Sequence, residues 1–111
     1  MTGLEKLTKL TNLGLGSNQL TELPEGLEKL TQLTKLDLLN NKLTDLKGLQ
    51  NLSQLEALGL GGNQLTSVKG LEKLTQLKRL SLYDNSDLTK AQIDELQKAL
   101  PKCDILSNPK K

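Results

Sequence analysis

Histidine is absent from this 111-residue chain, and cysteine and aromatic residues are represented by one residue each, Cys103 and Tyr83. Without histidine, the commonest general base for a serine or cysteine nucleophile is missing, and no cysteine–histidine cluster can hold zinc. A single cysteine also excludes a disulfide within the chain. We therefore expect no catalytic residue, no metal and no cofactor, and we expect that the protein is not an enzyme. Cys103 is expected to be a small core residue.

Long apolar runs and a strong charge of one sign are missing as well. No segment approaches the ~20 consecutive apolar residues that cross a membrane, and the chain turns charged at Glu5 and Lys6, unlike a signal peptide. The net charge is +2, with 15 basic and 13 acidic residues interspersed, whereas nucleic-acid-binding proteins cluster a larger basic excess. We expect neither a membrane nor a nucleic acid as partner. The location is unknown; the cytoplasm is the default, and a secreted fragment would look the same.

Leucine, by contrast, supplies 30 of the residues, and the leucines follow a pattern that repeats five times. Each copy ends in an asparagine, and these asparagines are separated by 23, 22, 22 and 23 residues: Asn18, Asn41, Asn63, Asn85 and Asn108. A repeat of this length is typical of a solenoid, in which each unit buries its apolar face only against its neighbours.

The repeated pattern LxxLxLxxN predicts a short strand followed by a turn. Because side chains alternate along a strand, the two leucines one residue apart point to the same side, and we expect them to form the core. The asparagine amide can bond to backbone groups of the turn that would otherwise be buried without partners. The five asparagines are therefore expected to form a structural ladder. The five copies cover 10–18, 33–41, 55–63, 77–85 and 100–108, with Cys103 and Ile105 replacing leucines in the last.

With Leu20, Leu43, Leu65 and Leu88 after the asparagines, the chain resembles the leucine-rich repeat family, whose pattern is LxxLxLxxNxL. The repeat length is similar to that of short bacterial, internalin-like members. The resemblance implies an α/β fold, namely a curved solenoid with about five short parallel strands on the concave face, 3₁₀ or short helical turns on the convex side and a C-terminal capping helix. It also implies a role in protein–protein recognition.

The segments that return from one strand to the next contain leucines three residues apart, which suits 3₁₀ turns. Gly26, Gly48 and Gly70 precede these leucines, and we expect positive φ angles there. Near the C-terminus, Thr89 and Gln92 form the capping-box pattern T-x-x-Q. We expect a single domain over 1–111, with a partial unit over 1–9, repeats that begin near 10, 33, 55 and 77, a capping helix over 90–100 and an edge strand over 102–106.

The chain begins inside a return segment, at Gly3 and Leu4, so we expect leucines and a strand edge to be exposed at that end. Three explanations stay open: a fragment of a longer array, a homodimer or larger assembly formed through this edge, and an engineered minimal solenoid.

The residues between and just after the core leucines are expected to belong to the strands and to face outward on the concave side. They form four rows across the repeats: Asn12, Lys35, Ala57 and Arg79; Gly14, Asp37, Gly59 and Ser81; Gly16, Leu39, Gly61 and Tyr83; and Ser17, Asn40, Gly62 and Asp84. The glycines suggest either a smooth floor for the backbone of a partner or a surface with no selected ligand. Leu39 and Tyr83 flank Gly61, and Lys35 and Arg79 flank Ala57, which favours an acidic partner.

The main hypothesis is a module that binds a protein or peptide on its concave face without catalysis. Its candidate contact residues are Lys35, Asp37, Leu39, Asn40, Gly59, Gly61, Arg79, Ser81, Tyr83 and Asp84. The alternative is a structural, self-assembling or designed scaffold protein that associates through its N-terminal end.

Overall fold

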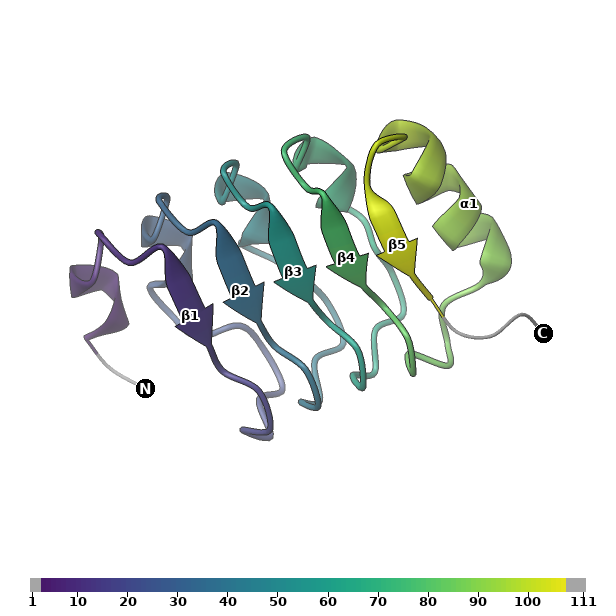
Figure 1. Ribbon diagram of the computed structural model, residues 1–111. Helices are drawn as coiled ribbons and strands as arrows, with labels where there is room; N and C mark the ends of the chain where they lie inside the picture. The colour runs from purple at the N-terminus through teal and green to yellow at the C-terminus, as the bar shows by residue number, and fades with distance from the viewer. Residues whose placement is uncertain (1–2, 108–111) are drawn as a thin grey trace.

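The computed structural model describes residues 3–107, which form a two-layer arc (Figure 1). One layer is a five-stranded parallel sheet in the order β1-β2-β3-β4-β5. The other contains four single-turn 3₁₀ helices and one α-helix. The strands are β1 (Asn12–Gly14), β2 (Lys35–Asp37), β3 (Ala57–Gly59), β4 (Arg79–Ser81) and β5 (Asp104–Leu106); the helices are η1 (Leu4–Lys6), η2 (Leu27–Lys29), η3 (Leu49–Asn51), η4 (Leu71–Lys73) and α1 (Lys90–Ala99). The expected solenoid is confirmed.

The strands stack in an unbroken register because the repeats have nearly equal length. The central leucine of each strand pairs with its counterpart in the next, so that Leu36, Leu58 and Leu80 lie in one row. These three side chains are buried, as are the leucines two residues later in each repeat. Each buried leucine contributes about 1.5–3 kcal/mol relative to an exposed one. The leucine column between the two layers is therefore the main source of stability.

Each strand is only three residues long, so the third and fourth rows of expected outward residues lie beyond the strand ends. The expectation that these rows belong to the strands is wrong. Ser17, Asn40 and Asp84 have φ angles of 57–58°, and Gly62 has φ 73°. Strand residues need negative φ, so the chain must turn at these positions. The turn redirects Asn40 and Asp84 away from the strand surface.

The return segments run through η1 to η4 on the side opposite the sheet (Figure 1). The glycine before each of these helices adopts the left-handed conformation; Gly48, for example, has φ 102°. This conformation is strained for other residues. The turn places the following leucine inside, and Leu27, Leu49 and Leu71 are all buried. The equal shape of the return segments keeps the strands in register.

The last unit differs because α1 replaces the 3₁₀ helix. Thr89 and Gln92 form the expected capping box: the Thr89 hydroxyl accepts from Gln92 N, and the Gln92 side chain accepts from Thr89 N at 2.9 Å. Leu96 packs inward from this helix, and Leu100 follows at its end. Strand β5 then begins at Asp104, two residues later than the expected strand over 102–106. Cys103 precedes it and is buried.

The asparagines that follow the strands link successive repeats. Asn63 donates from Nδ2 to the carbonyls of Leu38 and Leu60, at 3.0 and 2.9 Å, and its Oδ1 accepts from Leu43 N at 3.1 Å. Asn41 and Asn85 make equivalent bonds and are also buried. Asn18 is exposed. Asn108, the fifth expected member, lies outside the described residues.

Candidate functional site

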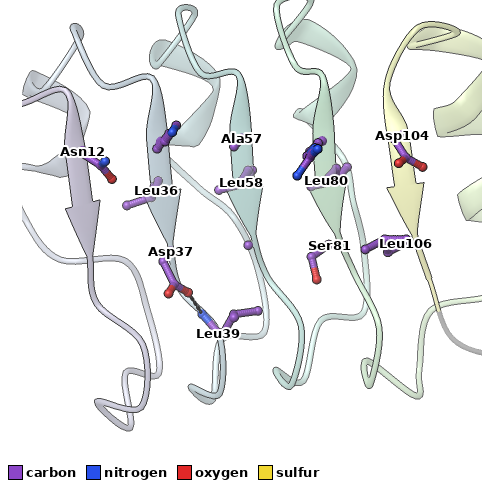
Figure 2. A pocket seen from close by; sticks show the side chains of 13 residues that line it. Asn12, Leu36, Asp37, Leu39, Ala57, Leu58, Leu80, Ser81, Asp104 and Leu106 are labelled. Atoms are coloured by element: carbon purple, nitrogen blue, oxygen red, sulfur yellow. Dashed lines mark hydrogen bonds between the residues drawn. The ribbon is translucent and has the colours of Figure 1, made fainter.

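A shallow groove with a volume of about 400 Å³ lies on the concave face of the sheet. Figure 2 shows it crossing the strands, with side chains from all five contributing to its lining. Its floor is formed by the strand backbones, including those of Leu36, Leu58 and Leu80, whose side chains are buried, and its walls are formed by outward residues of the strands. The residues that line it are Asn12, Lys35, Leu36, Asp37, Leu39, Ala57, Leu58, Gly59, Arg79, Leu80, Ser81, Asp104 and Leu106.

The groove collects six of the ten candidate contact residues, and it leaves four outside. Lys35, Asp37, Leu39, Gly59, Arg79 and Ser81 line it. Asn40, Gly61, Tyr83 and Asp84 do not. At Asn40 and Asp84 the chain turns with a positive φ angle. The candidate residues of the sequence therefore divide between a groove and its neighbouring rim.

Two outward groove residues, Asp104 and Leu106, are absent both from the ten candidates and from the four rows chosen from the sequence. They belong to the degenerate fifth repeat, where Asp104 pairs in register with Arg79, and Leu106 with Ser81. Leu106 is 57% exposed. Cys103 and Ile105 take the inward positions of this repeat. Because side chains alternate along a strand, this spacing assigns Asp104 and Leu106 to the outward side and would have found them.

Charged residues of both signs line the groove without neutralising one another in pairs. Among residues 3–107, the ion pairs are Lys78 with Glu56 and Lys90 with Asp94, both at exposed positions. Lys35 and Arg79 are thus exposed cations that make no ion pair with any described residue. Asp37 instead accepts a hydrogen bond at Oδ1 from Leu39 N, 2.9 Å away, which Figure 2 shows as a dashed line.

The glycines of the third repeat hold side chains of the neighbouring repeats. A β-carbon built on Gly61 would lie 2.6 Å from Cζ of Tyr83, so the tyrosine ring lies directly over this glycine. A β-carbon on Gly59 would lie 3.3 Å from Cγ of Leu39. A smooth, open floor, one of the two alternatives for the glycines, does not apply at Gly61, because the ring of Tyr83 covers it. Glycine is required at this position to admit the ring.

Two polar groups in and next to the groove, the Ser81 hydroxyl and the Cys103 thiol, are buried. No cluster of three or more metal-ligating side chains occurs among residues 3–107. Burial, with a smaller contribution from the charge of Asp104, raises the pKa of the Cys103 thiol, so this side chain stays protonated and unreactive at neutral pH. The hydroxyl oxygen of Ser81 is buried and has no hydrogen-bond partner within the described part of the chain. A buried hydroxyl without a partner costs on the order of 1–3 kcal/mol.

In the part of the chain that the structure covers, no helix has the length and apolar character needed to cross a membrane.

Comparison with known proteins gives two family matches. A model described as leucine rich repeat matches residues 8–65, which is more than half of the chain, and a model for two copies of leucine rich repeats matches residues 53–101. No curated protein sequence matches the chain significantly.

Solved bacterial structures share the fold along nearly the whole chain. A leucine-rich repeat protein of Leptospira interrogans is 39% identical with a TM-score of 0.83, and the alignment covers 92% of this chain and 26% of that one. An internalin of Listeria monocytogenes is 31% identical with a TM-score of 0.85, covering 97% and 32%. The functional domain of InlJ from the same organism, described as including a cysteine ladder, is 31% identical with a TM-score of 0.78, covering 97% and 23%.

The chain thus spans between about a quarter and a third of the length of these three chains. After its strands this chain carries asparagines, of which Asn41, Asn63 and Asn85 are buried. It contains a single cysteine. The repeat pattern, the parallel sheet with its 3₁₀ return segments and the family matches agree. The chain belongs to the leucine-rich repeat family.

Proposed function

We propose that this chain is a protein- or peptide-binding module that recognises its partner on the concave face and carries out no catalysis. Leucine-rich repeats in general serve as protein-interaction modules, and the specific face is our proposal. We further propose that residues 1–111 act as one domain.

The observation that carries this proposal is the groove itself. It is open to solvent and combines the apolar side chains of Leu39, Ala57 and Leu106 with exposed cations and carboxylates. Such a combination of apolar area and a few polar groups is characteristic of binding sites. We expect Lys35, Asp37, Leu39, Gly59, Arg79 and Ser81 to contact the partner directly, and Asn40, Gly61, Tyr83 and Asp84 to contribute from the rim.

The size of the face limits the affinity. Five strands about 4.8 Å apart, each three residues and therefore about 10 Å long, present on the order of 240 Å². A standard interface buries about 800 Å² per partner. We therefore expect micromolar affinity for a short peptide and tighter binding only where the partner also contacts the rim.

The test uses a displayed library of random 12-residue peptides, selected for binding to the purified chain. The blocking variant is Ala57→Arg, which fills the groove from an outward strand position that tolerates a larger side chain. The matched control is Ser53→Arg, which adds the same side chain at an exposed position that does not line the groove.

Peptides that bind the parent chain and Ser53→Arg, but bind Ala57→Arg at least ten times more weakly, would support the proposal. Peptides that bind all three proteins equally would overturn the concave-face assignment. Circular dichroism of each variant establishes that the fold is retained.

A further inference from the structure

The middle of the groove is a trough along β3, which we call the β3 trough. Its floor is Ala57 and Gly59, and its walls are Lys35 on β2 and Arg79 on β4. Lys35, Ala57 and Arg79 occupy the same register position on three adjacent strands. Strands lie about 4.8 Å apart, so the α-carbons of Lys35 and Arg79 are separated by roughly 10 Å. The small side chain of Ala57 leaves that space open.

The two walls present positive charge toward the same space. Neither Lys35 nor Arg79 pairs with a carboxylate among residues 3–107, although Asp37 and Asp104 lie close in the register. Asp37 is oriented by its bond from Leu39 N toward the end of its strand. A carboxylate seated over Ala57 would therefore have a cation on each side, and charge-assisted hydrogen bonds of this kind are the stronger ones in proteins.

The same two aspartates limit how much negative charge the groove accepts. Asp37 lies two residues beyond Lys35, and Asp104 lies beside Arg79. A second acidic side chain next to the first would approach one of these carboxylates and be repelled. The trough is thus suited to one carboxylate, and a run of acidic residues fits it poorly.

The next position along the trough is apolar. Leu39 leans over Gly59, and Leu106 stands across from it beside Ser81, as Figure 2 shows. Residues two apart on a strand are separated by about 6.6 Å, and the same spacing separates alternate side chains of an extended peptide. An extended segment lying along β3 can therefore place one side chain over Ala57 and the next on the same side between Leu39 and Leu106. Ser81, whose hydroxyl has no partner among residues 3–107, lies beside this second position.

We propose that the β3 trough recognises an extended segment of a partner protein that carries one aspartate or glutamate, with an apolar side chain two residues away. The carboxylate lies over Ala57 between Lys35 and Arg79, and the apolar side chain lies against Leu39 and Leu106. This inference rests on the proposed function and specifies the chemistry of the partner.

The experiment determines the sequences of the peptides that are selected from the random library. The expected result is enrichment of a single acidic residue with leucine, isoleucine, valine, methionine or phenylalanine two positions away on either side. Selected peptides are then synthesised in pairs that differ only by glutamate and glutamine, or by aspartate and asparagine. Dissociation constants are measured by fluorescence anisotropy at about 0.15 M salt, near physiological ionic strength.

We expect the amide twin to bind roughly 2- to 10-fold more weakly, because two partly exposed ion pairs are lost. The double variant Lys35→Gln with Arg79→Gln should bring the two peptides of each pair to equal affinity. The control double variant Lys9→Gln with Lys47→Gln removes the same charge at exposed positions that do not line the groove. In that control the difference between the twins should persist.

Three outcomes separate the inference from the proposed function. If Ala57→Arg weakens peptide binding but the exchange of acid for amide leaves the affinity unchanged, the inference is overturned. The concave face then remains the binding surface. Enrichment of acidic runs would also overturn it, because the trough would then act as a general anion surface. Peptides that Ala57→Arg does not block would overturn both.

Discussion

Single asparagines tie β2, β3 and β4 each to the strand before it. Asn63 Nδ2 donates to carbonyls of two successive repeats, those of Leu38 and Leu60, and its Oδ1 accepts from Leu43 N in the earlier of the two. All of these bonds are buried. The asparagine thus satisfies backbone groups that the tight turn leaves without partners.

We expect Asn63→Ala to lower the free energy of unfolding by about 2–3 kcal/mol, because the Leu43 amide would be left buried without a partner. The Leu38 and Leu60 carbonyls would each lose one of two donors and keep the bonds from Asn41 and Asn85. Urea denaturation monitored by circular dichroism measures this change. Asn18→Ala is the matched control, since Asn18 is exposed at the first turn, and we expect a loss of about 1 kcal/mol or less. Equal losses for the two variants would contradict a role that depends on burial.

Gly61 and Tyr83 form a second residue-scale feature, in which a glycine in one repeat holds a ring from the next. Gly61→Ala is compatible with the local backbone, because its φ is not in the left-handed region. Its methyl group would displace the Tyr83 ring. We expect tyrosine fluorescence, which comes from Tyr83 alone, to become more accessible to a neutral quencher. Gly14→Ala, whose β-carbon would meet no atom within 4 Å, should leave the quenching unchanged.

A double-mutant cycle checks the same contact energetically. Gly61→Ala should change the free energy of unfolding less in a Tyr83→Ala background than in the parent chain, because the ring that the methyl group displaces is then absent. Additive effects of the two substitutions would show that the ring does not contact Gly61 in solution.

The sequence predicted the placement of single residues well where a strict spacing applied, and less well beyond the strands. Lys35 and Arg79 follow from alternation along a strand. The orientation of Tyr83 does not, because it depends on where the left-handed turn at Asp84 directs the chain. Asp104 and Leu106 were within reach of the same alternation, but the degenerate fifth repeat weakened the pattern that would have assigned them.

At the scale of elements, α1 differs from the 3₁₀ return segments in having its own capping box and a bond to the preceding repeat. Gln92 accepts from Thr89 N and donates to the Thr66 carbonyl at 3.1 Å. The helix therefore begins at a point fixed both locally and by the neighbouring repeat. The sequence revealed the local part through the T-x-x-Q pattern, whereas the contact to Thr66 requires the folded arrangement.

We expect Thr89→Ala to destabilise the chain by about 1 kcal/mol, the usual cost of losing a helix N-cap. Lys90→Ala is the control, because its ion pair with Asp94 is exposed and such pairs contribute about 0–1 kcal/mol. The measurement is amide hydrogen exchange of residues 90–99 together with urea denaturation. We expect faster exchange throughout α1 in Thr89→Ala and unchanged exchange in Lys90→Ala. Equal exchange in the two variants would show that packing on η4, and not the capping box, sets the helix start.

At the scale of the whole molecule, the period of the asparagines determined most of the fold. A repeat of 22 or 23 residues is too short to bury its own core, so stacking in register follows from the period. The groove follows less directly, since its shape depends on which outward side chains lean across to a neighbouring strand. Leu39 over Gly59 is such a case, and no spacing rule predicts it.

Stability along the arc should vary even though its hydrogen bonds are uniform. Four equivalent amides, those of Leu15, Leu38, Leu60 and Leu82, each donate to the next strand at 2.6–2.8 Å. Leu15 is 8% exposed, whereas Leu38 and Leu60 are fully buried. In a solenoid each unit is stabilised by its neighbours, and β1 has a neighbouring strand on one side only.

For the isolated 111-residue chain we therefore expect the Leu15 amide to exchange with an opening free energy at least ~1 kcal/mol below that of Leu38 and Leu60, through local opening of the first repeat. Native-state hydrogen exchange measured by nuclear magnetic resonance gives these values directly. Because the four donor–acceptor distances are nearly the same, a difference among them reports on stacking and not on the individual bonds. Equal opening free energies at all four amides would contradict this gradient and show that the arc opens only as a whole.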